Sequence, residues 1–300
     1  MADDDRPLVS LVITSRGAGD DLLACIESFH RMGDDRFDII VAARLSTETA
    51  EQIHHRFPDL RIERAAEPLS IPELRAMGIR AARGEIIAMT TGWCRAGEQW
   101  LDAVRRAHRR GADVVGGAIE YAGSDRPASR AMFFCEYGRY EPPFDISVSV
   151  DLPGQNVSYT RSAINDLMPL IAAGSWEPLW HWYLHARGFR LVRDAAILVR
   201  MDHAFTMRGF LSDRYHYSRA FAAQRLAGRS WPARALYSAA TAALPAVLAG
   251  RFLRQILRAP NVRIQRLRLM PFILLFSVPW AVGECVGGIF GAGSSAARID

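Results

Sequence analysis

The sequence contains no lysine, so all 37 of its basic residues are arginines. An arginine-only composition is typical of a GC-rich genome. Cysteine is also scarce, and the four residues, Cys25, Cys94, Cys135 and Cys285, show no CxxC spacing. This scatter argues against a zinc ribbon or a disulfide framework and fits a reducing compartment. No apolar run follows the acidic start MADDDRP, so we expect no signal peptide and a chain that begins in the cytoplasm.

Acidic residues become rare in the last third of the chain. Beyond Arg200 they are Asp202, Asp213, Glu284 and Asp300, whereas arginine recurs every few residues. A basic, apolar C-terminal third predicts an anionic membrane surface as a partner. We do not expect a nucleic-acid partner, because the arginines alternate with long apolar runs and not with polar or aromatic stacking positions.

Apolar runs of strand length alternate with helical spacing over the first 121 residues. The expected strands are 8–14, 37–42, 60–64, 85–89 and 113–121, and the helices between them are 21–32, 47–57, 71–83 and 98–110. This alternation predicts βαβ crossovers and a mainly parallel sheet flanked by helices. Ligands of such sheets bind beyond the carboxyl ends of the strands, so residues 90–94, a polar break after the fourth strand, are a candidate site.

Regularity weakens after residue 122. Residues 123–143 are a long connection of the kind that shapes a binding face. A turn at 153–159 leads into a short strand, and a helix over 176–187 is closed by Gly188. A strand over 189–199 and a helix over 213–228 follow.

The last seventy residues differ in kind, and we place a domain boundary between residues 1–230 and 231–300. Residues 236–249 are apolar but interrupted by Pro245, and 251–268 are basic. Residues 269–292 are long enough to cross a bilayer. Since the basic segment and the first domain should both stay cytoplasmic, one full crossing between them is excluded. We prefer interfacial packing of both apolar segments over a single C-terminal span.

Two short sequence patterns each allow more than one functional interpretation. Arg16-Gly-Ala-Gly-Asp-Asp21 follows the first strand, but its aspartates would repel a pyrophosphate, so an N-capping turn is favoured over a dinucleotide loop. Glu177, His181 and His185 share one helix face and could ligate a metal, or could form a plain Glu–His surface pair. Glu177 is also placed to serve as a general base, or as an ordinary first-turn glutamate.

The order of motifs resembles family 2 glycosyltransferases of the GT-A fold. The similar stretches are 9–14, 38–47, 78–87, Gly116-Gly117, Pro153-Gly-Gln-Asn156, 186–191 and 280–287. The resemblance implies transfer of a sugar, with inversion, from a nucleotide-sugar donor to a lipid or glycan acceptor. It also implies a divalent metal, Mg²⁺ or Mn²⁺, held on the diphosphate by an Asp-x-Asp motif.

Residue by residue, the chain departs from that pattern on the donor side. The nucleobase-binding aspartate falls near Ala43, and the metal motif falls on Thr91-Gly92-Trp93, which contains no carboxylate. His203 matches the family's late metal-binding histidine. The Glu-Asp pair that holds the base falls on Trp176-Glu177, so the resemblance implies Glu177 as the catalytic base.

We therefore expect one of two functions. The first is a divergent glycosyltransferase at the cytoplasmic face of the inner membrane, in which arginines replace the metal. The second is an inactive relative that binds a glycan, a lipid or a partner protein. The expected donor-binding residues are Thr14, Arg16, Arg44, Thr91, Gly92, Trp93 and Arg95, and the expected acceptor-binding residues are Gly117, Gln155, Asn156, Trp176 and His181.

Overall fold

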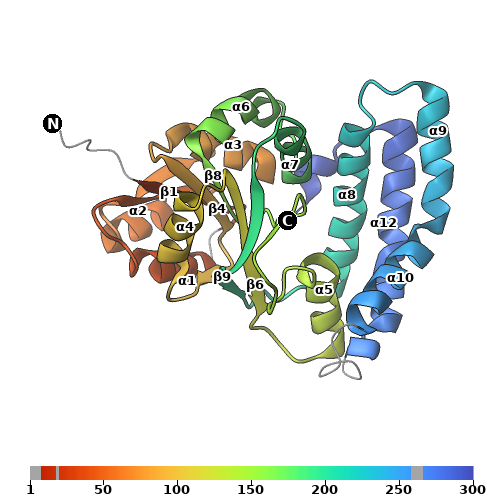
Figure 1. Ribbon diagram of the computed structural model, residues 1–300, viewed down its shortest axis with the longest axis horizontal. Helices are drawn as coiled ribbons and strands as arrows, with labels where there is room; N and C mark the ends of the chain where they lie inside the picture. The colour runs from red at the N-terminus through yellow and green to blue at the C-terminus, as the bar shows by residue number, and fades with distance from the viewer. Residues whose placement is uncertain (1–7, 18–19, 258–265, 300) are drawn as a thin grey trace. The chain divides into compact units, whose positions relative to one another are not determined.

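A computed structural model describes residues 8–17, 20–257 and 266–299. By its internal contacts the chain forms two compact units (Figure 1). The sheet unit comprises Met1–Ala122 and Tyr140–His203, and the helical unit comprises Gly123–Arg139 and Ala204–Asp300. This grouping places residues 204–230 with the helices, whereas the sequence division at 230 placed them with the sheet. That division into functional domains stays a prediction.

The first half of the sheet unit is the expected series of βαβ crossovers. Its elements are β1 (Val9–Ser15), α1 (Asp20–His30), β2 (Phe37–Ala43), α2 (Thr47–Arg56), β3 (Arg61–Arg64), α3 (Ile71–Ala81) and β4 (Ile86–Thr91). The four strands are parallel in the order β3-β2-β1-β4. Polar caps start two of the helices, since Ser46 accepts a bond from the Thr49 amide and Ser70 exchanges bonds with Glu73.

The second half turns the sheet into a mixed one. It contains β5 (Cys94–Ala96), α4 (Trp100–Arg109), β6 (Val114–Tyr121), β7 (Ser147–Val148), β8 (Asn156–Thr160), α6 (Arg161–Ala172), α7 (Glu177–Ala186) and β9 (Leu191–Met201). β8 inserts between β4 and β6 and is antiparallel to both, so β6 runs in the same direction as β4. β9 is parallel to β6, whereas β5 and β7 are antiparallel to β9. The expected mainly parallel α/β sheet is therefore confirmed, with β5, β7 and β8 as its antiparallel strands.

Three local expectations need correction. Residues 123–143 are not an irregular connection, since they contain α5 (Pro127–Tyr137). α6 was not predicted, although Thr160 caps it by accepting a bond from the Ala163 amide. The polar break expected at 90–94 is only a two-residue turn, because β4 continues to Thr91 and β5 starts at Cys94. Gly188 does close α7, with a φ of 86°.

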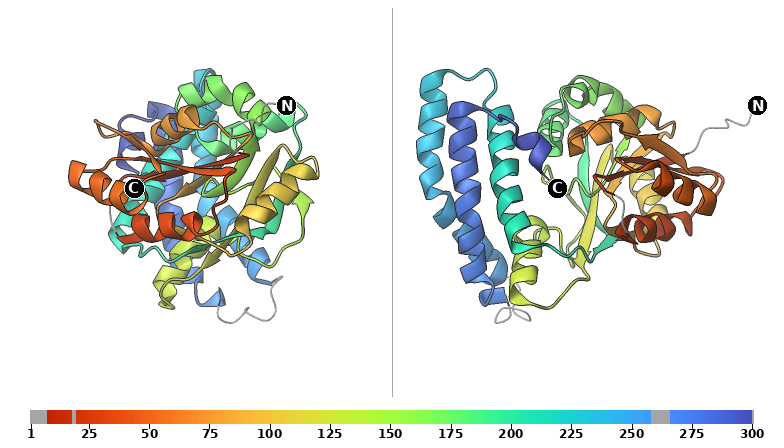
Figure 2. Two further views of the ribbon diagram at one scale, coloured as in Figure 1. Left: turned by 90° about the vertical axis from the view of Figure 1, so that its left-hand side faces the viewer. Right: turned by 180° about the vertical axis from the view of Figure 1, so that it is seen from behind.

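The helical unit is a layer built around α12 (Met270–Phe290). α8 (Met207–Arg225) lies along one side of α12, with α9 (Trp231–Ala240) and α10 (Leu244–Leu257) on its other sides, as both views show (Figures 1 and 2). α5 and the short turns η1 (Thr241–Ala243) and η3 (Ser295–Arg298) complete the unit. Pro245 does not interrupt a helix, because it stands in the first turn of α10. Residues 258–265 of the expected basic linker lie outside the described residues.

Candidate functional site

The ends of β1, β2 and β4 meet at the carboxyl edge of the sheet. In the register, Ser15 faces Ala43 and Thr14 faces Thr91. The Thr14 hydroxyl donates to the Thr90 carbonyl oxygen at 3.2 Å, and the Gly92 amide donates to the Thr14 carbonyl oxygen at 3.0 Å. The side chains of Thr14 and Thr91 are buried. These two predicted donor residues therefore hold the strand ends together, and their hydroxyls are not free at the surface.

Gly92 and Trp93 form the turn between β4 and β5. A Cβ at position 92 would lie 3.1 Å from Ser15 Oγ and 3.2 Å from Leu22 Cδ1, so a larger residue there would have to displace these two side chains slightly. The Trp93 ring lies against the His203 ring, with centroids 4.8 Å apart and planes 31° apart. The buried Trp93 Nε1 has no acceptor among the described residues. A ligand oxygen at this position would satisfy it.

The three predicted donor-side arginines differ in their surroundings. Arg16 is partly exposed and Arg44 is exposed, and the Arg44 amide donates to the Ser15 carbonyl oxygen at 3.3 Å. Because Ser15 and Ala43 end adjacent strands, Arg16 and Arg44 emerge side by side. Arg95 instead forms an ion pair with Asp202, which sequence reasoning missed.

Arg95 also lies 3.8 Å from the carboxylate of Asp21. Asp202 Oδ1 is buried and receives no hydrogen bond from the part of the chain that the structure describes. This edge thus brings three guanidinium groups, which can bind the oxygens of a diphosphate, next to the carboxylates of Asp21 and Asp202. Arg95 must exchange its carboxylate partners for phosphate to take part.

On the acceptor side, Asn156 is committed to structure. Its Nδ2 donates to the carbonyl oxygens of Ala118 and Ile197, both at 2.8 Å, and its Oδ1 accepts from Trp100 Nε1 at 2.9 Å. These three bonds leave one lone pair of the buried amide. A Cβ at Gly117 would lie 2.2 Å from Asn156 Nδ2, so that glycine makes room for the amide. Both residues position β8 against β6 and β9, which places them behind the site.

Glu177 begins α7, and its side chain is 4% exposed. It is ion-paired with Arg75 of α3, which is 1% exposed and also donates to the Gly154 carbonyl oxygen at 3.1 Å. The Arg75 guanidinium donates to Oε1 of Glu177. Oε2 faces Gly154, where an added Cβ would lie 2.8 Å from this oxygen. The predicted base therefore lies in a closed ion pair, with the Gly154 backbone packed closely against its other carboxylate oxygen.

The predicted metal-binding face of α7 is not assembled. His181 is buried, and its Nε2 lies 2.8 Å from the Tyr159 hydroxyl, while His185 is exposed. Burial, with the Arg75 charge nearby, lowers the His181 pKa to about 3, so this ring is neutral at pH 7. Over residues 8–17, 20–257 and 266–299 no three His, Cys, Asp or Glu side chains cluster. Trp176 caps α7 and is buried, and Gln155 accepts a bond from the Thr90 hydroxyl through its carbonyl oxygen.

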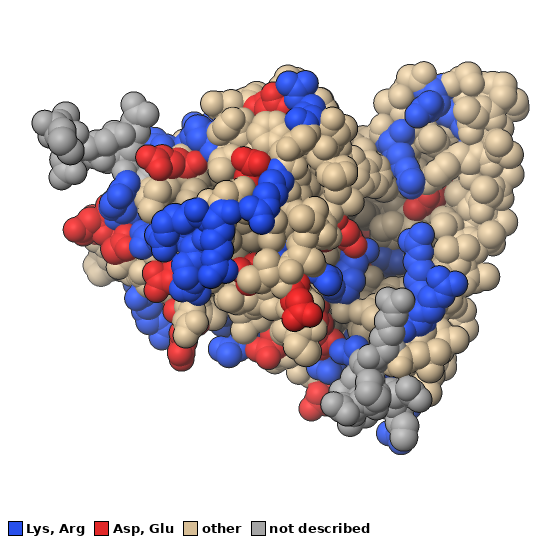
Figure 3. Space-filling model, in the orientation of Figure 1, with Lys and Arg blue, Asp and Glu red and all other residues tan. Residues whose placement is uncertain are grey.

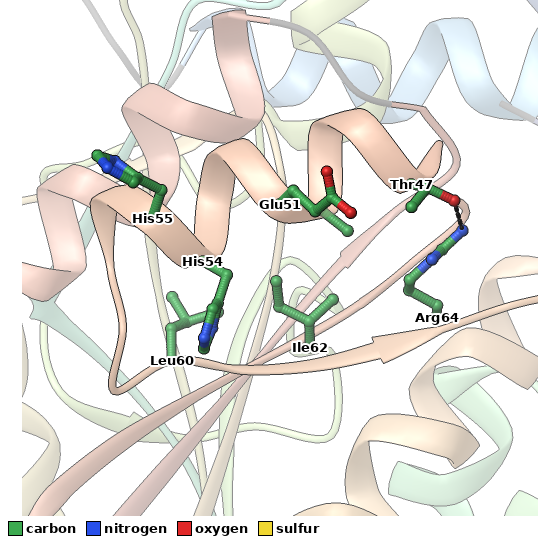
Figure 4. A pocket seen from close by; sticks show the side chains of 8 residues that line it. Thr47, Glu51, His54, His55, Leu60, Ile62 and Arg64 are labelled. Carbon is green, nitrogen blue, oxygen red and sulfur yellow. Dashed lines mark hydrogen bonds between the residues drawn. The ribbon is translucent and has the colours of Figure 1, made fainter.

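A separate groove lies between α2 and the edge strand β3 (Figure 4). Leu60 and Ile62 form its apolar floor, and Arg64 donates to Thr47 at 3.2 Å at one end. His54 and His55, expected to face solvent, are exposed on its rim. The groove carries none of the predicted site residues.

A profile of the family "Glycosyl transferase family 2" matches residues 10–165, just over half of the chain. The chain belongs to glycosyl transferase family 2. The match covers the strand-end edge described above and ends before Glu177. No curated protein sequence matches this chain.

Solved structures of two glycosyltransferase-like proteins share the fold. A mannosyltransferase from Pyrobaculum calidifontis, PcManGT, was solved with GDP-Man and Mn²⁺; the TM-score is 0.50 at 14% identity, covering 94% of this chain and 74% of that one. S. aureus TarS, residues 1–349, gives a TM-score of 0.52 at 12% identity, covering 93% and 90%. At these identities the likeness shows the fold alone. The GT-A expectation is thereby confirmed.

Proposed function

We propose that this chain is a glycosyltransferase that binds the diphosphate of a nucleotide sugar at the carboxyl edge of β1, β2 and β4. The observation that carries the proposal is the convergence of Arg16, Arg44 and Arg95 on that edge, beside the unsatisfied Trp93 Nε1. Guanidinium groups bind phosphate oxygens in a bidentate manner, so fixed arginines can neutralise a leaving diphosphate. The acceptor is a lipid or glycan at a membrane surface.

The residues present do not fit a metal held in the usual way. Trp93 occupies the position of a ligating carboxylate and covers one face of His203, and Asp202 is engaged by Arg95. Mg²⁺ and Mn²⁺ take carboxylate, carbonyl and water oxygens, which an indole cannot supply. The proposed reaction therefore includes no metal. His203 would bind the donor by stacking or hydrogen bonding.

Glu177 remains the proposed base. Its Oε2, the carboxylate oxygen that is not paired with Arg75, would accept the proton of the acceptor hydroxyl in an inverting displacement. The Arg75 guanidinium would hold the carboxylate in place through Oε1. The donor phosphates leave as the acceptor oxygen forms its bond to the anomeric carbon.

A second candidate is a non-catalytic relative that binds a glycan, lipid or partner protein. The closed Arg75–Glu177 pair favours it, because a guanidinium already engages one oxygen of this buried carboxylate. The two functions differ in a measurable way: only the first requires donor binding followed by sugar transfer.

The deciding experiment is calorimetric titration of the purified chain with UDP- and GDP-sugars, with and without Mn²⁺. We expect binding without Mn²⁺, and at least a tenfold loss of affinity in Arg44→Gln, since a charge-assisted phosphate contact contributes about 1.5–3 kcal/mol. The matched control is Arg36→Gln, an exposed arginine before the opposite end of β2, which should leave affinity unchanged.

Absence of binding to every nucleotide sugar would refute the donor site. Binding without transfer to lipid or glycan acceptors would establish the second candidate. If the parent chain binds donor only with Mn²⁺, and His203→Ala no longer binds donor, this histidine holds a metal after all.

A further inference from the structure

The outer side of α12 carries a continuous stripe of exposed apolar side chains. They are Leu274, Leu275, Val278, Val282, Ile289 and Phe290, each 39–74% exposed. At about 100° per residue these positions fall within one side of the helix. The buried residues of α12, among them Gly283, Glu284 and Gly287, fall on the opposite side. The helix is therefore divided along its length into a protein-facing side and an apolar outer side, which we call the lipid face.

α9 and α10 extend the exposed apolar surface of the helical unit. Trp231 and Leu236 of α9 are 72% and 74% exposed, and Val247 of α10 is 45% exposed. Only 11% of the apolar window within Trp231–Leu257 is buried. The right-hand part of Figure 3 shows the result, a long uncharged surface with arginines gathered in strips. An exposed apolar area of this extent marks an interaction surface.

The charge of the unit identifies the occupant. Its sequence contains 16 arginines and five acidic residues, a net charge of +11. Exposed arginines such as Arg251 and Arg254 stand on the same helix as Val247. A second copy placed on this surface would bring two arginine-rich rims together, with few carboxylates to pair with them. An anionic bilayer complements both the apolar face and its basic rim.

α12 has the length to cross a bilayer, about 31 Å for its 21 residues. Its packing against α8 argues against a crossing. A Cβ at Gly283 would lie 2.3 Å from the Tyr215 carbonyl oxygen, and one at Gly287 would lie 2.2 Å from that of Arg219. Phe210 and Phe276 are in ring contact at 4.8 Å, and Arg219 donates to the Gly291 carbonyl oxygen at 3.0 Å. α8 thus accompanies α12 from Phe276 to its end.

A crossing by α12 would therefore take α8 into the hydrocarbon. The charged residues of α8 are Arg208, Asp213, Arg214, Arg219 and Arg225. Each Arg or Asp at the centre of a spanning helix costs about 2.5–3.5 kcal/mol. On the protein-facing side, Glu284 accepts hydrogen bonds from Tyr237 and, at 2.7 Å, from Trp280 Nε1, so it is satisfied only while these helices stay together.

We propose that the helical unit lies in the plane of an anionic membrane, with the lipid face of α12 immersed in one leaflet, α8 turned to water and no segment crossing. This specifies how the membrane contact of the proposed function is made. It does not depend on donor binding, because the face contains none of the sheet-edge residues.

The first test measures co-sedimentation of the purified full chain with vesicles of phosphatidylglycerol and phosphatidylcholine, without nucleotide sugar. Val282→Asp should reduce the partition coefficient at least tenfold, because it places a carboxylate in the lipid face. Ser212→Asp, at an exposed position of α8, adds the same charge and should change the partition coefficient less than twofold. Circular dichroism of both variants verifies folding. Equal binding of all three proteins would overturn the assignment, as would a lipid-free dimer that Val282→Asp converts to a monomer.

The second test determines topology in sealed vesicles. Ser230→Cys and Ser294→Cys are introduced one at a time into a chain that carries Cys285→Ala. Both positions are exposed. Each variant is then treated with a membrane-impermeant maleimide. In-plane binding predicts that both are labelled without detergent. A crossing by α12 would protect the cysteine at 294 until detergent is added, and that result would refute the proposal.

Discussion

In both units of this chain arginine is the only strongly basic residue, but the two units carry opposite net charges. The sheet unit has 21 arginines and 27 acidic residues, a net charge of −6, whereas the helical unit carries +11. The bulk value of +5 conceals this contrast. The difference fits the proposed arrangement, in which water surrounds the acidic sheet unit and the basic helical unit lies on an anionic lipid surface.

The units also differ in how they bury polar groups. The sheet unit buries an ion pair, Arg75 and Glu177, and a neutral histidine, His181, and it holds a second neutral histidine, His108, half-buried. α12 instead packs through glycines and holds its buried Glu284 with hydrogen bonds from neutral side chains. The helical unit also buries a charge, since Arg214 of α8 is ion-paired with Glu136 of α5 at 2.7 Å. The stability of the sheet unit should therefore respond to charge and pH, and that of the helical unit to side-chain volume at α12 as well as to charge.

The largest expected effect is on the Arg75–Glu177 pair. Glu177→Gln leaves a buried guanidinium without its counter-charge, so we expect a loss of about 3–5 kcal/mol in the free energy of unfolding, measured by urea denaturation. The double variant Arg75→Met with Glu177→Met removes both charges and should recover most of that loss.

Turnover separates the structural role from the proposed catalytic one. If Glu177 is the base, the refolded double variant still binds donor but transfers no sugar. Full transfer by the double variant would exclude Glu177 as the base. Equal stability of Glu177→Gln and the parent chain would contradict the buried pair itself.

The hydrophobic periodicity of the sequence predicts more of the fold than of the candidate site. The first four strands and their helices were predictable because each βα step is encoded locally, by an apolar run followed by helical spacing and a cap such as Ser70–Glu73. The place of β8 between β4 and β6 was not, because pairing of strands distant in sequence leaves no local pattern. α5 was missed because its residues, PASRAMFFCEY, read equally well as an aromatic loop.

The site follows the same rule. The convergence of Arg16 and Arg44 at adjacent strand ends was predictable from the βαβ order. The partners of Arg95 and Glu177 were not, since Asp202 lies 107 positions from Arg95 in the sequence and Arg75 lies 102 from Glu177. No spacing rule connects such residues, so the sequence predicts Glu177 only as a general base or an ordinary first-turn glutamate. Its burial emerges only from the fold, which brings Arg75 of α3 to the start of α7.

The second prediction concerns acid sensitivity of the sheet unit. Burial lowers the pKa of His108 from 6.5 to about 4, where Nδ1 meets the Ala112 carbonyl oxygen and Nε2 the Ser158 hydroxyl. Since the unfolded chain takes up this proton near pH 6.5 and the folded chain only near pH 4, stability falls as the pH drops through that interval. The loss is about 3 kcal/mol at its full extent.

Urea denaturation between pH 7.5 and 4 tests this. His108→Gln should flatten the pH dependence by about that amount, whereas His54→Gln, at an exposed histidine of the same unit, should not. Parallel pH profiles for all three proteins would show that His108 is not the titrating group.

The smallest effect compares two glycines of the helical unit and tests its dependence on volume. Gly287→Ala places a Cβ 2.2 Å from the Arg219 carbonyl oxygen, so α8 and α12 must separate, at a cost of about 1–3 kcal/mol. At Gly250 in α10 a Cβ meets nothing within 4 Å, and alanine there should stabilise the helix by up to about 1 kcal/mol. Opposite shifts of the urea midpoint, followed by circular dichroism at 222 nm, are expected. Stabilisation by both alanines would mean that backbone contact between α8 and α12 does not hold the unit together, and the packing argument against a membrane crossing would lose its basis.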